Sequence, residues 1–422
     1  MSAEDSPRRK ILMVAYHFPP LAGSSGIQRT LRFVQHLTAL GWQPIVLTAS
    51  PWAYARTSSD LMADVPAEVL VKRSFALDTA RHLALRGRYW GALALPDRWA
   101  TWRFAAVYDG LQLIRRYRPE AIWSTYPIAT AHVIGAELQR RSGLPWVADF
   151  RDPMVQEGYP ADPRQWRHFQ RIEDRVAHSA ARVVFTTPGA LKTYGERYPA
   201  AAARMALIEN GYDEESFRGA VAPAPVARPD APIVILHSGI VYPAERDPTQ
   251  LFIALATLKA QALVTPAMLR LKFRASAHDA NLRALAARYQ VEDFIELGAA
   301  LPYREALGEM LAADALLILQ DAGCNDQIPA KLYEYLRAGR PILGLTDPRG
   351  DTAHALRQAG LNAIAALEDA AAITALLPNF LAEVRAGRAS LPQPQAVASA
   401  SRLARTHSLI GLLDDIKKTV SA

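Results

Sequence analysis

The sequence has almost no cysteine and no long hydrophobic run. Cys324 is the single cysteine among 422 residues, so no disulfide can form within the chain, and a reducing compartment such as the cytoplasm is expected. No run approaches 18 consecutive apolar residues, which predicts that no helix spans a membrane. The first apolar run, residues 11–15, is too short for the core of a signal peptide and is typical of a buried strand.

Several functional motifs are missing as well. The dinucleotide pattern G-x-G-x-x-G does not follow the first apolar run, where only Gly23 and Gly26 occur, and this argues against a nicotinamide enzyme. Histidine, cysteine and carboxylate residues show no metal-ligand spacing, so we expect no metal ion. No nucleic-acid-binding motif accompanies the basic residues, so nucleic acid is not an expected partner.

The chain is long enough for two domains, and half of its residues are hydrophobic. Strand-like runs alternate with amphipathic helical stretches, which indicates an α/β fold with parallel sheets and ligands bound in an interdomain cleft beyond the carboxyl ends of the strands. Four prolines between Val221 and Pro232 predict a linker. The predicted parts are an N-terminal Rossmann-like domain, a linker, a second Rossmann-like domain and a final helix that packs back on the first domain, at residues 1–219, 220–232, 233–395 and 396–422.

The predicted strands follow the same alternation. Those of the first domain lie at 11–15, 44–48, 121–124, 145–149, 182–186 and 205–209, and those of the second at 233–237, 270–274, 294–297, 315–319 and 341–345. A helix is predicted near 25–40, after the first strand.

A loop of small residues follows the first predicted strand. Small side chains let backbone amides approach an anion, and the next helix offers its positive N-terminus. Its candidate donor-binding residues are Gly23, Ser24, Ser25 and Gly26. His17, Arg29 and His132 are candidates for contact with an acceptor, and a packed helix histidine is the alternative for His132.

Two further groups follow buried strands. Asp149, Arg151 and Asp152 are candidate catalytic residues at the end of one strand, with a structural ion-pair cluster as the alternative. In the second domain, Ser238 and Gly239 form a turn after a strand, and Arg246 opens a helix, which is a suitable clamp for a diphosphate. The alternative there is an ordinary strand-to-helix turn.

The most specific segment runs from Asp326 to Arg340. Pro329 is placed for the first turn of a helix, Gly339 ends that helix and Pro341 opens the next strand. Asp326 precedes the helix and Glu334 lies inside it, and a pair of carboxylates can accept hydrogen bonds from sugar hydroxyls. The free amides of the helix start suit a phosphate.

A basic stretch lies between Lys72 and Arg118. It holds ten basic and three acidic residues, a difference of +7 that equals the net charge of the chain, and Trp90, Trp99 and Trp102 lie among them. Such a mixture suits an anionic membrane surface or a lipid-phosphate acceptor, and a solvated basic face with core tryptophans is the alternative.

With these segments in order, the chain resembles the family-4 retaining glycosyltransferases of the GT-B fold over nearly its whole length. Residues 11–48, the stretch Ile208-Glu209-Asn210-Gly211-Tyr212-Asp213, residues 296–298 and 313–315, and the segment from Asp326 carry the resemblance. Asp149-Phe150-Arg151-Asp152 places it in a subgroup with an Asp-x-Arg-Asp segment.

The resemblance implies transfer of a sugar from a nucleotide diphosphate sugar, with retention and without metal or other cofactor. Asp326 would contact the sugar, Glu334 the ribose, and Arg246 the diphosphate. The chain around Ile328, Pro329, Ala330 and Lys331 would hold the diphosphate through its amides. The family often has a lysine where Leu251 and Phe252 stand, whose charge Lys331 could replace, and a histidine where Arg151 stands.

The basic, tryptophan-bearing stretch alone suggests the acceptor, a growing surface polysaccharide or a lipid-phosphate-linked glycan. The expected location is the cytoplasm, with peripheral attachment to the inner face of the membrane as an option. Two other functions stay open. One is a sugar-nucleotide 2-epimerase on the same fold, and the other is a non-catalytic protein that binds nucleotide sugars.

Overall fold

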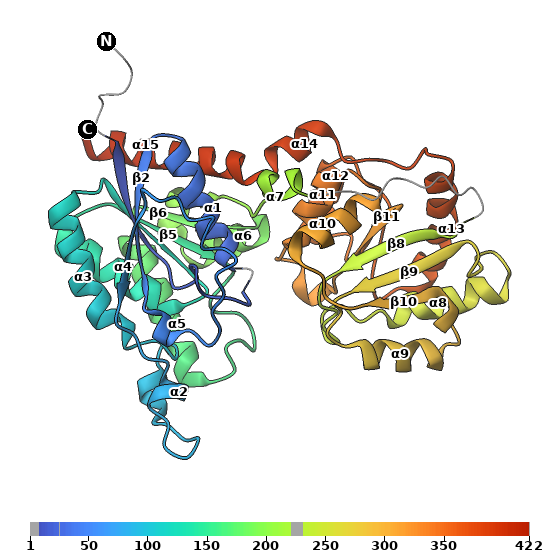
Figure 1. Cartoon of the computed structure of the whole chain (residues 1–422), viewed down its shortest axis with the longest axis horizontal. Helices are drawn as coiled ribbons and strands as arrows, with labels where there is room; N and C mark the ends of the chain where they lie inside the picture. The colour runs from blue at the N-terminus through green and yellow to red at the C-terminus, as the bar shows by residue number, and fades with distance from the viewer. Residues whose placement is uncertain (1–7, 25, 221–230, 422) are drawn as a thin grey trace, which may run out of the picture. The chain divides into compact units, whose positions relative to one another are not determined.

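The computed structural model describes residues 8–24, 26–220 and 231–421. The chain folds into two compact units (Figure 1), of which the first contains Met1–Glu209 together with Arg402–Ala422, and the second contains Asn210–Ser401. Each unit has a parallel β-sheet with helices on both faces. Both are therefore Rossmann-like α/β units, as the alternation of strand and helix patterns predicts.

The first unit contains a seven-stranded sheet in the order β3-β2-β1-β4-β5-β6-β7. Its strands are β1 Arg9–Val14, β2 Trp42–Ala49, β3 Leu70–Ser74, β4 Ala121–Thr125, β5 Trp146–Arg151, β6 Arg182–Phe185 and β7 Met205–Leu207. Its longer helices are α1 Gly26–Ala39, α3 Trp102–Tyr117, α4 Ala129–Ser142, α5 Pro163–Ser179, α6 Pro188–Arg197 and α15 Arg402–Ser421, and a short α2 spans Thr79–His82.

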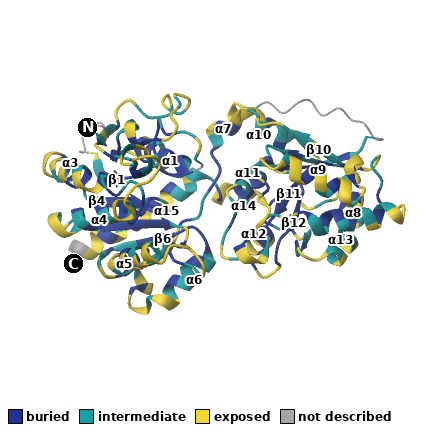
Figure 2. Ribbon diagram, turned by 90° about the horizontal axis from the view of Figure 1, so that it is seen from below, coloured by how far each residue is buried: buried dark blue, intermediate teal, exposed yellow. Residues whose placement is uncertain are grey.

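The central strand of this sheet shows why its residues are continuously apolar. Leu12 and Val14 belong to the core beneath α3, α4 and α5, whereas Ile11 and Met13 belong to the core beneath α1 and α15. Successive side chains of a strand point to opposite faces, so a strand covered on both faces must be apolar at every position. Figure 2 shows these strands as buried ribbons and the outward faces of the helices as exposed.

The second unit contains a six-stranded parallel sheet in the order β10-β9-β8-β11-β12-β13. Its strands are β8 Ile233–Ser238, β9 Leu269–Arg274, β10 Ile295–Gly298, β11 Ala315–Leu319, β12 Ile342–Leu345 and β13 Ile364–Ala365. Its helices are α7 Glu214–Arg218, α8 Thr249–Ala260, α9 Asp279–Arg288, α10 Tyr303–Ala312, α11 Lys331–Ala338, α12 Asp351–Gln358, α13 Ala370–Arg385 and α14 Pro394–Ser399. In both sheets the order reverses beside the first strand of the unit, which is where ligands bind in open α/β sheets.

The boundaries of the units differ from those expected from the prolines. The first unit ends at Glu209 rather than at residue 219, and the final segment is divided between the units. The single helix expected at 396–422 is two helices, because α14 ends at Ser399 and α15 begins at Arg402. Only α15 returns to the first unit, where it lies beside α1 (Figure 1). Most of the predicted linker, residues 221–230, lies outside the described residues.

Two edge strands were not predicted. β3 reads Leu-Val-Lys-Arg-Ser and has only Ser74 fully buried, and β13 has two residues. Edge strands of this kind are short and partly charged, so they give little hydrophobic periodicity.

In the part of the chain that the structure describes, no helix has both the length and the apolar character needed to cross a membrane.

Candidate functional site

The loop after β1 and the end of β5 meet at one place in the first unit. Gly26 begins α1, and a Cβ atom built on it would overlap His17 Nδ1 and lie 2.9 Å from Arg151 Nη1. Ser24 Oγ lies 3.2 Å from His17 Nδ1 and accepts a hydrogen bond from the Gly26 amide at 3.2 Å. The missing side chain at Gly26 is thus what allows the imidazole and the guanidinium to approach the helix start.

Arg151 lies in an unusual backbone position. Its φ is 63°, in the left-handed region, and the pairing of β5 with β6 shifts register between Asp149 and Arg151. Its Nη1 donates only long hydrogen bonds, at 3.4 Å to Gly26 O and 3.5 Å to Tyr126 O, and within the described ranges its Nε has no partner. The bulge therefore points a half-buried, weakly bonded cation at the loop that follows β1.

Arg29 and Asp149 form a second, different arrangement at the same end of the sheet. Arg29 Nε and Nη2 donate to the two Asp149 oxygens at 2.9 and 2.8 Å, and both side chains are buried. Arg29 also donates to the carbonyl oxygens of Glu209 and Ile208 at 3.0 and 2.9 Å, and Asp149 accepts a further bond from Thr125. Both candidates are therefore engaged with the protein itself. The ion pair differs from the sequence alternative, which joined Asp149 and Asp152 to Arg151 rather than to Arg29.

The other candidates of the first unit lie apart from this pair. Gly23 has a φ of 80° and open space around it, and Asp152 is exposed. Ser25 lies outside the described residues. His132 has no exposed surface and lies in the first turns of α4, where its Nδ1 is 2.8 Å from Ser124 Oγ and its ring contacts Phe150. His132 is thus packed inside its unit through one ring nitrogen, while the other, Nε2, has no partner among the described residues.

Burial and neighbouring charge decide the protonation of His17 and His132. Burial, with the nearby charge of Arg151, lowers the pKa of His17 to about 4, and burial lowers the pKa of His132 to about 4. Removal from water disfavours the charged imidazolium. Both rings are therefore neutral at pH 7 and act there as hydrogen-bonding groups.

In the second unit, the end of β8 meets the start of α11. Gly239 has a φ of 111°, which favours glycine, and a Cβ atom on it would lie 3.2 Å from Lys331 Nζ. Lys331 Nζ is 2.9 Å from His237 Nε2, and His237 Nδ1 is 3.1 Å from Leu317 O. A carbonyl can only accept, so Nδ1 carries the ring proton and Nε2 accepts from the lysine. A neutral histidine thus holds the ammonium group beside the glycine turn.

The helix α11 is fixed to the same turn by a second bond. Tyr335, one turn after Lys331, accepts a hydrogen bond from the Ser238 amide at 2.8 Å. Burial and the charge of Arg246 hold the pKa of Lys331 well below its usual value, and burial with the charge of Lys331 does the same to the pKa of His237. Two cations and a neutral histidine at one turn would favour an arriving anion.

The remaining donor candidates surround this turn. Arg246 is half-buried, donates to Ile240 O at 2.7 Å and lies over the Tyr242 ring. Tyr303 donates to Glu334 at 2.7 Å, which orients that carboxylate on α11. Asp326 is exposed in the loop before the helix.

That loop has a hydrogen-bonded frame. Gln320 donates to the carbonyls of Cys324 and Gln327 at 2.8 and 3.0 Å, and Asn325 donates to Asp347 at 2.8 Å. The helix begins at Lys331 rather than at Pro329, which is a correction of two residues, with Ile328 buried and Pro329 and Ala330 in the turn before it. Gly339 ends the helix with a φ of 67°, as predicted.

The described residues contain neither a candidate metal cluster nor a reactive cysteine. In the described ranges, no group of three or more His, Cys, Asp or Glu side chains is arranged to hold a metal ion. Burial raises the pKa of the Cys324 thiol to about 11, so the thiolate needed for nucleophilic attack is scarce at pH 7.

Residues 25–211 match the family model described as a glycosyl transferase 4-like domain. Over these residues the chain resembles that family of domains. No curated protein sequence matches the chain.

Solved structures extend the likeness beyond residues 25–211 to both units. Sucrose-phosphate synthase from Thermosynechococcus elongatus is 15% identical over 98% of each chain, with a TM-score of 0.61. HepE of Anabaena, solved in complex with UDP and glucose, is 14% identical over 96% of this chain and 100% of its own, with a TM-score of 0.64. A structure named as a UDP-N-acetylglucosamine 2-epimerase of Listeria monocytogenes is 11% identical over 98% and 97%, with a TM-score of 0.56. The chain has the GT-B fold, as the sequence resemblance predicts.

Sequence reasoning missed the partners that hold the candidate residues. His237 and Tyr303 bind Lys331 and Glu334 across 94 and 31 residues of sequence, a separation that leaves no local pattern. A row of basic residues on α5 was also missed, namely Arg167, Arg171 and Arg175. Their spacing of four residues places them on one face of the helix and was a readable signal.

Proposed function

We propose that the protein is a retaining glycosyltransferase that moves a sugar from a nucleotide diphosphate sugar to a glycan or lipid-phosphate-linked acceptor in surface polysaccharide synthesis. The observation that carries the proposal is the cluster of Lys331, His237 and Gly239 where β8 meets α11. Two comparisons support the same class of donor. One is the match to the glycosyl transferase 4-like domain. The other is the fold shared with HepE, which is 14% identical to this chain and was solved in complex with UDP-glucose.

The cluster suits a diphosphate for three reasons. Gly239 exposes backbone without a side chain, Lys331 supplies a localised charge beside it, and Arg246 adds a second charge whose field reaches Lys331. The departure from the family pattern, in which Leu251 and Phe252 replace a lysine, is explained if Lys331 takes over its charge. Leu251 and Phe252 are themselves buried in the core of the second unit, so no lysine could replace them without burying a charge.

The proposed chemistry needs this positive charge more than a strong protein base. When the bond between the anomeric carbon and the diphosphate oxygen breaks, negative charge develops on the leaving phosphate, and preorganised cations stabilise it. In this proposal Lys331 and Arg246 carry that role, Asp326 contacts the transferred sugar, and Glu334, oriented by Tyr303, binds the ribose.

The first unit would supply the acceptor side of the reaction. Arg151 and His17, which pack over Gly26, are the proposed contacts with the reacting groups, and Asp152 is exposed next to them. Asp149 and Arg29 are proposed as positioning residues instead, since their hydrogen-bonding atoms are bound to each other and to the backbone.

A membrane-bound acceptor is favoured by one exposed loop. Trp102 is fully buried and Trp99 packs on Tyr16, so these tryptophans belong to the core. Trp90 and Leu85, by contrast, are 76% and 81% exposed in the loop after α2, which projects from its unit in Figure 1. Arg86 and Arg88 are exposed in the same loop. Apolar tips among arginines suit peripheral attachment to an anionic bilayer on the cytoplasmic side.

The experiment that tests the function is a donor screen. The purified protein is incubated with UDP-, GDP-, TDP- and ADP-sugars, and release of nucleoside diphosphate is measured with and without a lipid-linked glycan fraction. We expect release with one donor class, and a fall in kcat/KM of about 10²–10³ in Lys331→Met, because one stabilising donor at a developing negative charge has that value. Lys192→Met, an exposed lysine of the first unit, is the control.

Other results would favour a different enzyme or none. Release of nucleotide together with an epimerised sugar, and without an acceptor, would favour the 2-epimerase, a function supported by the fold shared with the Listeria monocytogenes structure. Failure to bind any nucleotide, with Glu334→Ala unchanged in every readout, would reject the proposed transferase and leave the fold as a scaffold.

A further inference from the structure

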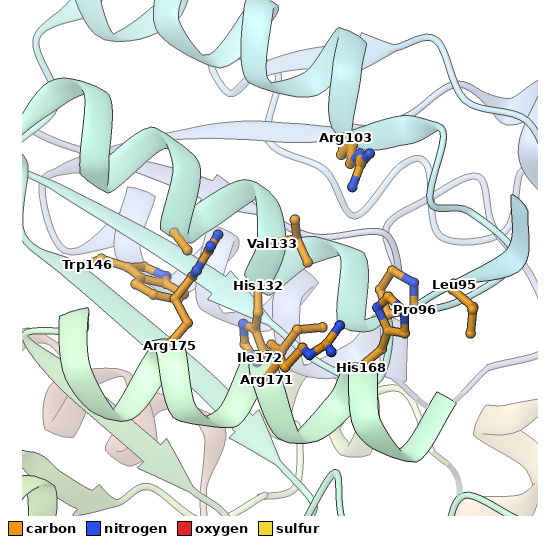
Figure 3. Close-up of a pocket in the computed structure, with 11 residues that line it drawn as sticks. Leu95, Pro96, Arg103, His132, Val133, Trp146, His168, Arg171, Ile172 and Arg175 are labelled. Carbon is orange, nitrogen blue, oxygen red and sulfur yellow. The ribbon is translucent and has the colours of Figure 1, made fainter. Parts of the chain in front are cut away.

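A basic pocket in the first unit lies outside the proposed donor cluster. It is a cavity of about 170 Å³ between α4, α5 and the segment that precedes α3. Figure 3 shows Arg171 and Arg175 on α5, Arg103 at the start of α3 and His132 on α4 around this pocket. The residues that line it, all of them described, include three arginines and two histidines and no carboxylate.

The charges of this pocket are not neutralised within the described ranges. Arg103, Arg171 and Arg175 are exposed, and none of them forms an ion pair with a described carboxylate. Three carboxylates adjoin the lining in sequence, and each is engaged elsewhere. Asp97 accepts bonds from the Thr130 amide and hydroxyl at 2.7 and 2.9 Å. Glu173 accepts from Tyr194 and Arg197, and Asp174 accepts from the Tyr198 hydroxyl at 2.9 Å. Three guanidinium groups at one cavity repel one another unless an anion lies between them.

The floor of the pocket holds a polar atom without a partner. His132 has no exposed surface, and its Nε2 lacks a hydrogen-bond partner among the described residues. Its Nδ1 lies 2.8 Å from Ser124 Oγ, and the same oxygen accepts a bond from Trp146 Nε1 at 2.8 Å. Buried polar atoms are nearly always paired, so an orphan atom at a cavity calls for a ligand or a water molecule.

The hydrogen-bond chain fixes which nitrogen of His132 carries the proton. Trp146 Nε1 can only donate, so Ser124 Oγ accepts there. Among the described residues His132 Nδ1 is the available acceptor for the Ser124 hydroxyl proton, which therefore donates to it. With Nδ1 as an acceptor, the neutral ring carries its hydrogen on Nε2. The orphan atom is then a donor, which matches an anion rather than a cation.

We propose that this pocket binds a phosphate or diphosphate group, held by Arg103, Arg171 and Arg175 and by the Nε2–H of His132. The ligand goes beyond the proposed donor, because the pocket is built from elements of the first unit alone. The group can come from a phospholipid headgroup or from a soluble phosphate ester. Arginine forks and a neutral donor are the groups that bind phosphate oxygens in proteins.

The test compares two charge-matched variants of the full chain. Arg171→Gln/Arg175→Gln removes two pocket arginines, and Arg115→Gln/Arg116→Gln removes two exposed arginines of α3 that do not line the pocket. Both carry Lys331→Met, so that binding at the proposed donor cluster is suppressed. Inorganic pyrophosphate is titrated by calorimetry. We expect the pocket variant to bind at least about tenfold more weakly than the control variant, since charge-assisted bonds are the strong ones.

A second arm identifies the source of the phosphate. Vesicles of phosphatidylcholine with phosphatidic acid or with phosphatidylserine are sedimented with the same two variants. Selective loss of binding to phosphatidic acid in the pocket variant indicates a lipid headgroup, and loss for pyrophosphate alone indicates a soluble ester. Equal behaviour of the two variants with every probe would overturn the proposal.

The role of His132 can be tested in the wild-type protein, without a substitution that could prevent folding. Nitrogen-15 NMR of labelled protein reports the tautomer of His132, and we expect the proton on Nε2 and a shift of that resonance when pyrophosphate is added. A proton on Nδ1, or an Nε2 signal that pyrophosphate leaves unmoved, would contradict the assigned donor.

Discussion

Each unit brings a histidine, a glycine and a cation together where its first strand ends, but the two units hold the cation in different ways. In the second unit, Lys331 is held by the neutral His237 at 2.9 Å beside Gly239. In the first, Arg151 lies over Gly26 with bonds of 3.4 and 3.5 Å to carbonyl oxygens. Either cation can bind phosphate oxygens. The difference is that Lys331 is already held in place by His237, whereas Arg151 keeps donors without strong bonds.

The first unit also contains a buried ion pair beside its site, between Arg29 and Asp149. The ion pair of Arg29 with Asp149 is buried and closes the end of β5 next to the Arg151 bulge. The two arginines at this end of the sheet thus have different roles. Arg29 engages its donors in hydrogen bonds within the fold, whereas Arg151 keeps donors that a ligand could use. Burial and hydrogen-bond saturation, rather than residue type, therefore separate positioning residues from candidate catalytic ones.

The largest effect is expected from Arg29→Met. It leaves Asp149 charged and without its partner in a buried site, which should lower the free energy of unfolding by about 3–5 kcal/mol. Chemical denaturation measures the loss. Arg29→Met/Asp149→Asn should recover part of it, and a single variant within about 0.5 kcal/mol of the wild type, the range of ordinary surface substitutions, would show that the pair does not hold the strand end.

Arg151→Met should behave in the opposite way. Few strong bonds are lost on substitution, so unfolding should change little, while kcat/KM should fall about 10–100-fold if the guanidinium contacts a reacting group. Steady-state kinetics with the donor found in the screen provide the measurement. A variant with full activity would remove Arg151 from the site and leave the bulge as a structural feature.

Gly239→Ala tests the turn of the second unit. The φ of 111° strains any other residue, and the added Cβ would lie 3.2 Å from Lys331 Nζ. We expect a loss of about 1–2 kcal/mol in unfolding free energy, together with weaker nucleotide binding. Gly195→Ala in α6, where a Cβ meets open space, is the matched control and should not destabilise the protein.

The smallest effect concerns pH. Burial and Arg151 lower the pKa of His17 from 6.5 to about 4, so the unfolded chain binds a proton more readily than the folded one. This contribution to stability is complete above pH 6.5 and is lost as the pH falls from 6.5 towards 4, with a slope of up to about 1.4 kcal/mol per pH unit. His17→Asn should flatten the dependence in that window, and the exposed His354→Asn serves as control. An unchanged profile in His17→Asn would contradict a neutral, half-buried ring.

Local signals in the sequence were enough for most of the fold. The alternation of apolar runs predicted the central strands of both sheets, and Gly339 was correctly predicted to end α11, because strand burial and helix caps act over a few residues. The edge strand β3 was missed because half-exposed, charged residues carry no such periodicity.

The site was less predictable, because its contacts join distant residues. The segment from Asp326 and the glycine turns could be proposed from local chemistry. The saturation of Arg29 could not, since Asp149 is 120 residues away. The left-handed backbone of Arg151 could not be predicted either, because it depends on the register between β5 and β6. The hydrogen bond between His237 and Lys331 could not be predicted, because it depends on how β8 and α11 are placed.

The most direct measurement of the central claim is a crystal structure with the nucleoside diphosphate that the donor screen selects. We expect a diphosphate against Gly239, within hydrogen-bond distance of Lys331 Nζ and of the Arg246 guanidinium, and a ribose at Glu334. A nucleotide that is bound elsewhere while the Gly239 turn and Lys331 make no contact with it at saturating concentration would contradict this assignment.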